Sequence, residues 1–153
     1  ENVFFGESAA PETDEELKNA IQLSQAEEFV DKLPDGTEHM ISQMGRNVSG
    51  GQKQRLSIAR ALSRKPEILV FDDSFSALDY KTDAKLREGL NEKLKDTTKI
   101  IVAQRISTIR HADKIIVLDR GEAVGMGTHE ELMKNCDVYK EIALSQLSAA
   151  ELA

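Results

Sequence analysis

The stretch Ile68–Asp73 has the sequence ILVFDD, a short apolar run that ends in two acids. Pro66 precedes it, and such a run bounded by turn signals is typical of a strand covered on both faces, as in a parallel sheet. Two further apolar runs, Lys99–Ala103 and Lys114–Asp119, have the same character. Because helical patterns separate the runs, the sequence predicts an α/β fold with a mostly parallel sheet.

Helical patterns lie before, between and after the predicted strands. Thr13 and Glu16 form a capping box at the start of a helix that continues to Leu33, where Pro34 ends it. Other helices are predicted over residues 49–64 and 82–96 and from 128 onward, with capping boxes at Ser49/Gln52 and Thr128/Glu131. Residues 8–12 are predicted to form a loop.

Composition narrows the function classes. The chain has 153 residues and a formal net charge of −7, and residues 1–40 contain 11 of the 27 acids but only 2 of the 20 bases. This balance argues against binding to a nucleic-acid backbone, which needs a basic surface. The chain has a single cysteine, Cys136, which excludes an internal disulfide. Four bases near the 49–64 helix are interpreted as a solvated face: Lys53, Arg55, Arg64 and Lys65.

The stretch Ser49–Gln52 has the sequence SGGQ and opens a predicted helix. A helix N-terminus has unpaired N–H groups and a partial positive charge, so it attracts anions. Gly50 and Gly51 lack the Cβ atoms that would keep a phosphate at a distance. Taken alone, the same residues would equally fit a common flexible turn.

Polar residues follow two of the predicted strands. Asp72 ends the first strand, where a carboxylate is suited to hold Mg²⁺ on a nucleotide phosphate, and Asp73 could orient or deprotonate an attacking water. Gln104 follows the second strand and could sense a phosphate. Taken singly, the two acids would also fit a solvated strand end or a helix cap, and Gln104 would fit the cap of a short helix.

In this order and spacing, the stretches together resemble the ATP-binding cassette (ABC) ATPases. The resemblance covers essentially the whole chain. The matching stretches are Ser49–Arg55 (signature motif), Ile68–Asp72 (Walker B), Ser76–Asp79 (D-loop), Ile100–Ile109 (switch region) and, for the exporter subfamily, Glu1–Gly6 and Gly127–Leu132.

The resemblance implies a P-loop-NTPase-like α/β core, of which residues 66–153 would be the C-terminal part, and a helical subdomain over residues 1–65. It also implies ATP and Mg²⁺ as cofactors and hydrolysis of ATP to ADP and phosphate. In this family two nucleotide-binding domains pair head to tail. The signature residues would therefore contact the ATP of the partner domain: Ser49, Gly50, Gly51 and Gln52.

The other site roles are implied in the same way. Asp72 would hold Mg²⁺ through water, Asp73 would be the catalytic base, and Gln104 would contact the γ-phosphate. Ser76 and Asp79 would act in the D-loop. The resemblance further implies a transmembrane domain that contacts the loop Ile41–Gly45, and a place at the cytoplasmic face of a membrane.

The sequence departs from the family pattern in three respects. No Gly-x-x-x-x-Gly-Lys-Ser/Thr motif occurs in the 153 residues, so we expect the chain alone neither to bind ATP usefully nor to hydrolyse it. Asp73 stands where the family usually has glutamate, and Gln104 where it usually has histidine. The sequence therefore predicts a degenerate site in one subunit of a heterodimeric exporter, or in one half of a fused one.

Two alternatives belong to other function classes. The first is an ABC ATPase that does not transport, and the exporter-like stretch Gly127–Leu132 argues against it. The second is a regulatory module without catalysis, and the intact Gly50-Gly51 pair argues against that one.

Overall fold

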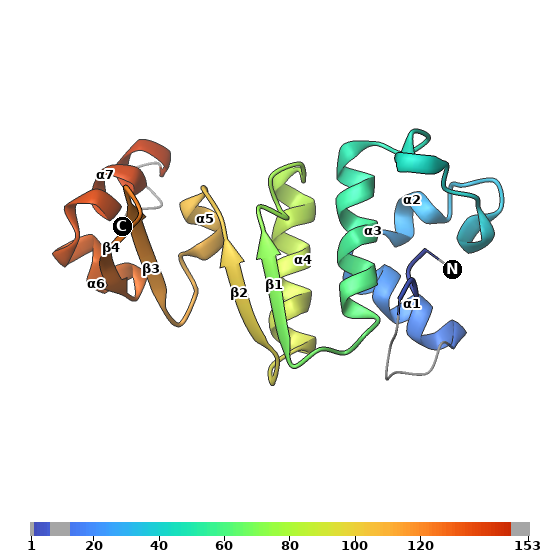
Figure 1. The fold of residues 1–153 in the computed structure, drawn as a ribbon, viewed down its shortest axis with the longest axis horizontal. Coiled ribbons are helices and arrows are strands. Elements are labelled where there is room, and N and C mark those ends of the chain that lie inside the picture. Colours follow the sequence, from blue (N-terminus) through green and yellow to red (C-terminus); the bar gives the residue numbers. More distant parts are fainter. Residues whose placement is uncertain (1, 7–12, 148–153) are drawn as a thin grey trace. The chain divides into compact units, whose positions relative to one another are not determined.

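The computed structural model of the chain describes residues 2–6 and 13–147 (Figure 1). The chain divides into two compact units, Glu1–Ile100 and Ile101–Ala153, each described by itself below. The loop predicted over residues 8–12 lies outside the described residues, and the division into residues 1–65 and 66–153 stays a prediction. In the part of the chain that the structure describes, no helix combines the length and apolar character needed to span a bilayer.

The first unit begins with a group of helices. They are α1 (Asp14–Leu23), α2 (Glu27–Val30) and α3 (Gly50–Leu62), with 3₁₀ turns at Gly36–Glu38 and Gln43–Gly45. The single helix predicted from Thr13 to Leu33 is wrong. The chain turns at Gln25, whose φ of 59° lies in the left-handed region, and this turn buries Ala26 and Phe29.

These helices share a small apolar core. Its buried members Ile21, Ala26, Phe29 and Val30 come from α1, α2 and their junction, and Leu56 of α3 packs against them. Thr13 caps α1 by accepting a hydrogen bond from the Glu16 N–H at 3.2 Å, which is one half of the predicted capping box, and the Glu16 carboxylate accepts from Lys65 Nζ. The core thus attaches α3 to the N-terminal helices.

The remainder of this unit carries the first sheet. Its strands are β1 (Ile68–Asp72) and β2 (Thr98–Val102), which neighbour each other in one two-stranded sheet; the last two residues of β2 are counted with the second unit. Both arrows point the same way in Figure 1, and α4 (Tyr80–Lys93) connects the strands, so the arrangement is a parallel β-α-β unit. The predicted α/β alternation is confirmed.

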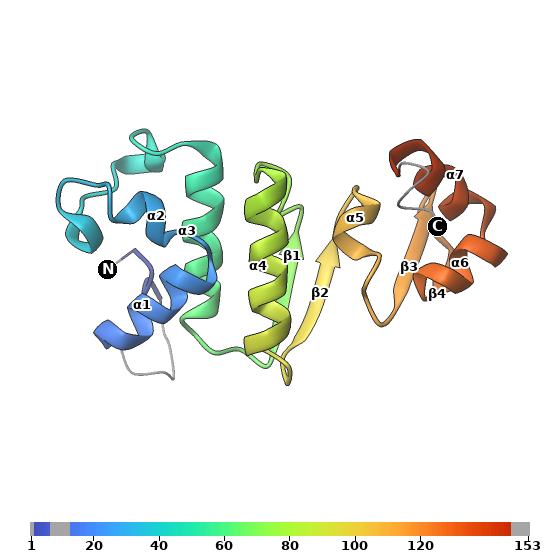
Figure 2. The same ribbon diagram turned by 180° about the vertical axis from the view of Figure 1, so that it is seen from behind.

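The two-sided burial predicted for β1 is only half right. Leu69 and Phe71 are buried, whereas Ile68 and Val70 are 58% and 63% exposed. Both views show α4 alongside β1 (Figure 2), and this helix covers one face of the strand. Among the described residues of this unit, no helix covers the other face in the same way.

In its described residues, the second unit combines an antiparallel hairpin with three helices. Its elements are α5 (Ile106–Ile109), β3 (Ile115–Asp119), β4 (Glu122–Gly127), α6 (His129–Asn135) and α7 (Asp137–Gln146). β3 pairs with β4 from Ile115–Gly127 to Asp119–Glu122, with an irregularity between Val117 and Leu118. The predicted capping box of Thr128 and Glu131 starts α6. The core contains Ile106, Ile115, Val117, Leu132, Tyr139 and Ala143.

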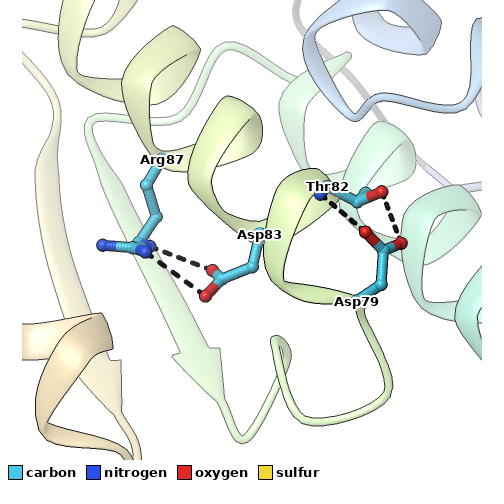
Figure 3. Close-up of polar contacts among 4 residues, drawn as sticks. All are labelled: Asp79, Thr82, Asp83 and Arg87. Atoms are coloured by element: carbon cyan, nitrogen blue, oxygen red, sulfur yellow. Dashed lines mark hydrogen bonds and ion pairs between the residues drawn. The ribbon is translucent and has the colours of Figure 1, made fainter. Parts of the chain in front are cut away.

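An ion pair is buried on α4. Arg87 donates two hydrogen bonds to the carboxylate of Asp83, from Nε to Oδ1 at 3.0 Å and from Nη2 to Oδ2 at 3.3 Å (Figure 3). The Asp83 side chain is 1% exposed and that of Arg87 is 19% exposed. The two hydrogen bonds offset the cost of removing this carboxylate from water.

We predict that Asp83→Ala lowers the free energy of unfolding by about 3 kcal/mol, because a largely buried guanidinium loses its carboxylate. Urea denaturation of the chain measures the loss. The control is Glu88→Ala, an exposed acid on the same helix, for which we expect a change within about 0.5 kcal/mol. Equal losses in the two variants would show that the buried pair contributes no more to the free energy of unfolding than an exposed acid does.

A second polar contact joins α6 to α7. His129 Nδ1 lies 2.7 Å from the hydroxyl oxygen of Tyr139, and the two rings meet edge to face with centroids 5.6 Å apart. Partial burial lowers the pKa of His129 below its ordinary value of 6.5, and nearby Arg110 lowers it further. Burial raises the pKa of Tyr139. The folded chain therefore favours the neutral form of both side chains.

We predict that the second unit loses stability as the pH is lowered through 6.5, the ordinary pKa of histidine. The pKa of His129 is lower in the folded chain, so the unfolded chain binds the proton more readily. Acidification therefore stabilises the unfolded chain relative to the folded one. Urea denaturation at several pH values measures this slope, which His129→Asn should reduce. An unchanged slope in the variant would contradict the assignment.

Candidate functional site

The N-terminus of α3 presents the Ser49–Gln52 motif. Ser49 caps the helix: its Oγ accepts from the Gln52 N–H at 3.3 Å, and its own N–H donates to Gln52 Oε1 at 2.8 Å. The predicted capping box is therefore present. Ser49 and Gly50 are exposed, and Val48 is buried just before them. The cap holds an exposed helix N-terminus, whose partial positive charge favours an anion.

The two glycines of this motif have different surroundings. A Cβ atom on Gly50 would meet nothing within 4 Å, so this position faces open space. A Cβ atom on Gly51 would lie 3.0 Å from the carbonyl oxygen of Ala77. The first turn of α3 thus lies against the loop that follows β1, and a larger residue at position 51 would push the Ala77 carbonyl away by a few tenths of an ångström.

Asp72 and Asp73 lie at the carboxyl end of β1, and both are exposed. Asp73 has a φ of 47°, in the left-handed region that non-glycine residues rarely adopt. Its carbonyl oxygen accepts hydrogen bonds from the Ser76 N–H at 3.3 Å and the Ser76 hydroxyl at 2.9 Å. These bonds hold the unusual backbone turn in place, and strained turns of this kind occur at functional sites.

The loop from Asp73 to Asp79 is anchored at both ends. Phe75 and Leu78 are buried, and the ring of Phe75 lies 5.1 Å from that of Phe71. Asp79 caps α4, accepting from the Thr82 N–H at 3.0 Å and from the Thr82 hydroxyl at 2.6 Å (Figure 3). The hydroxyl and the backbone N–H of Thr82 lower the pKa of Asp79, so its carboxylate is charged at neutral pH.

Gln54, which sequence reasoning missed, connects α3 to this loop. Its Oε1 accepts from the Ala77 N–H at 3.2 Å, and its Nε2 donates to the Asp73 carbonyl at 3.4 Å and the Ser76 hydroxyl at 3.5 Å. One amide therefore spans the turn from Asp73 to Ala77. No local sequence pattern predicts this role, because the partners of Gln54 lie 19 to 23 residues away along the chain.

Of the four bases interpreted as a solvated face, Lys53, Arg64 and Lys65 are exposed, whereas Arg55 is half-buried, so the interpretation is wrong for Arg55. Arg55 donates to the carbonyls of Gly51 at 3.4 Å and Gln25 at 2.8 Å, with its guanidinium 4.8 Å from the centroid of the Phe29 ring. Arg64 donates to the Phe5 carbonyl, and Lys65 pairs with Glu16. The long side chains of these bases reach polar groups of neighbouring segments, which helical spacing does not reveal.

Gln104 belongs to the second unit and is described with it. Its side chain is exposed, and its carbonyl accepts a hydrogen bond from Gln146 Nε2 at 2.8 Å. Within the first unit, the structure brings the residues of the signature-like motif together with the loop that contains Ser76. The predicted roles of all these residues at a nucleotide stay predictions.

The carboxylates at the end of β1 suit a magnesium ion that takes most of its ligands from water and phosphate. Mg²⁺ in phosphoryl-transfer sites keeps several waters and takes one or two carboxylates together with phosphate oxygens. Asp72 offers one exposed carboxylate of this kind. Over residues 2–6 and 13–147 there is no group of three or more metal-ligating side chains. The residues present therefore fit a nucleotide-bound Mg²⁺ and not a cage made of protein ligands.

The segment from Met40 to Asn47 forms an ordered loop. The Oδ1 of Asn47 accepts from the Ser42 N–H at 2.9 Å and the Ser42 hydroxyl at 3.0 Å, and Asn47 Nδ2 donates to the Met40 carbonyl at 2.9 Å. Met40 and Met44 are 80% and 78% exposed. The loop therefore presents apolar side chains on a hydrogen-bonded frame.

Comparisons with known proteins agree on one family. Residues 2–76 match the family model described as ABC transporter. The chain is 52% identical over 132 residues to a Mycoplasma genitalium protein named as an ABC transporter ATP-binding protein. The matched region covers 86% of this chain and 21% of that protein. It is 43% identical over 147 residues to an export ATP-binding/permease protein of Rickettsia felis, covering 96% of this chain and 25% of that one.

A solved structure shows the same fold. It is that of a bacterial Atm1-family ABC exporter with ATP bound, which is 33% identical to this chain and superimposes with a TM-score of 0.89. The match covers 96% of this chain and 26% of the exporter. The chain thus spans about a quarter of the length of the relatives it matches, and it corresponds to a portion of an ABC transporter ATP-binding domain, homologous to those of exporters.

Proposed function

We propose that this chain supplies the signature motif, the Walker-B acids and the switch residue of the ATPase domain of an ABC exporter, at the cytoplasmic face of a membrane. The observation that carries the proposal is the contact within the first unit between the exposed N-terminus of α3 and the loop after Asp73, through Gly51 and Gln54. The anion-attracting helix end and the acid-rich strand end each suit a nucleotide phosphate, and the contact fixes their relative place.

The residues of the chain would act on two different ATP molecules. Toward this domain's own ATP, Asp72 would hold Mg²⁺, which neutralises phosphate charge when bound. Asp73 would orient the attacking water and accept its proton, and Gln104 would donate a hydrogen bond to the γ-phosphate. Toward the ATP of the partner domain, the N-terminus of α3 would contribute Ser49, Gly50, Gly51 and Gln52. Ser76 and Asp79 would act in the D-loop between the two.

Binding of ATP also needs a phosphate-cradling loop, and no P-loop motif occurs in these 153 residues. The chain alone is therefore proposed to be inactive, and ATP hydrolysis belongs to the full-length protein that carries it. In that protein, residues Ile41–Gly45 would contact the transmembrane domain. The exposed Met44 and the frame built on Asn47 support this contact.

The site formed with Asp73 and Gln104 is proposed to be degenerate and to pair with a different, competent domain. Aspartate is one methylene shorter than glutamate, which moves the carboxylate by about 1 Å, and such a displacement can cost on the order of 10²-fold in rate. Glutamine keeps a hydrogen-bond donor but cannot carry a proton charge near neutral pH. Both features slow hydrolysis more than binding.

We predict that the double variant Asp73→Glu, Gln104→His of the full-length protein hydrolyses ATP about 10- to 100-fold faster at this site, because the base regains its reach. Single-turnover hydrolysis of radiolabelled ATP measures the change. Rapid hydrolysis by the unaltered protein as a homodimer, abolished by Asp73→Asn, would contradict the degenerate-site proposal while leaving the ATPase assignment intact.

A further inference from the structure

One side chain of α7 contacts the backbone on both sides of Arg105. Gln146 Nε2 donates to the Gln104 carbonyl at 2.8 Å, and Gln146 Oε1 accepts from the Ile106 N–H at 2.9 Å. Both distances are those of well-formed hydrogen bonds. The two partners lie 42 and 40 residues away along the chain. A single amide therefore fixes the backbone from Gln104 to Ile106.

The start of α5 needs an acceptor from elsewhere in the chain. The first N–H groups of a helix have no partner within it, and a side chain usually satisfies one of them. Arg105 precedes α5, and an arginine side chain has no acceptor atom. Gln146 therefore supplies from α7 the acceptor that the local sequence does not provide.

The helix that carries Gln146, α7, packs against the core of the second unit. Tyr139 and Ala143 of α7 are 2% and 0% exposed, and they share one apolar core with Ile106, which is 3% exposed. Packing at Ile106 and the two bonds of Gln146 thus hold the segment against α7. The side chain of Gln104 remains exposed at the start of this segment.

We propose that Gln146 is a positioning residue for Gln104. By fixing the Gln104 carbonyl, it sets the direction in which the exposed Gln104 side chain leaves the backbone, so that α7 controls the hydrogen bond to the γ-phosphate. The inference rests on the proposed function, in which Gln104 contacts that phosphate. It adds a residue from the last described helix to the machinery of hydrolysis.

The first test uses the full-length protein that carries this chain. Gln146→Leu removes both hydrogen bonds and keeps a side chain of similar size. We expect single-turnover ATP hydrolysis to slow by about tenfold, with the KM for ATP changed less than about twofold, since a misdirected side chain affects the chemical step more than binding. The matched control is Glu141→Gln, an exposed position on the same helix, and it should leave both values unchanged.

A double-mutant cycle separates positioning from simple structural support. Gln104→Ala should slow hydrolysis by itself, and in that background Gln146→Leu should have no further effect. In parallel, hydrogen exchange measured on peptides that contain Ile106 should become faster in Gln146→Leu and stay unchanged in Glu141→Gln.

Each outcome has a distinct meaning. Four results would overturn the inference while the ATPase assignment stands. Gln146→Leu could leave the rate of hydrolysis unaltered, lower it equally in the Gln104→Ala background, or leave hydrogen exchange at Ile106 unaltered. The fourth result is a Gln104→Ala variant that hydrolyses ATP as fast as the unaltered protein. Absence of ATP hydrolysis in the unaltered full-length protein would instead overturn the proposed function, and the inference with it.

Discussion

The close approach of α3 to the loop after β1 is the contact on which the rest of the candidate site depends. Gly51 allows the approach, because any Cβ atom there would press on the Ala77 carbonyl. Gln54 then connects the helix to the backbone from Asp73 to Ala77. Arg55 secures the other side of the same helix against Gln25 and Phe29. One helix thereby fixes the relative place of the anion-attracting turn and the acidic strand end.

Local patterns predicted the elements that depend on neighbouring residues. The capping boxes at Ser49 and Thr128 need only a partner three residues away, so the sequence reveals them directly. The apolar run before Asp72 likewise predicted β1 and the place of its acids. The break at Gln25 was missed, because helical spacing continues on both sides of it and only the burial of Ala26 and Phe29 explains the turn.

Contacts between distant residues could not be predicted in this way. Gln54 and Gln146 each connect segments that lie 19 to 42 residues apart, and nothing in their local sequence distinguishes them from solvated glutamines. Both use an amide, which donates and accepts at once, to hold backbone next to a candidate catalytic residue. A distant side chain thus holds the backbone at Asp73 and at Gln104, two positions where the sequence is predicted to depart from the family pattern.

We infer that the chain contributes one part of an ATP site whose phosphate-cradling loop lies outside these 153 residues. Calorimetric titration of Mg²⁺-ATP into the chain alone and into the full-length protein that carries it tests this claim directly. We expect no detectable heat of binding with the chain and clear binding with the full-length protein. Tight binding of ATP by the chain alone would contradict this claim, because the nucleotide would then be held by residues that are assigned here to other roles.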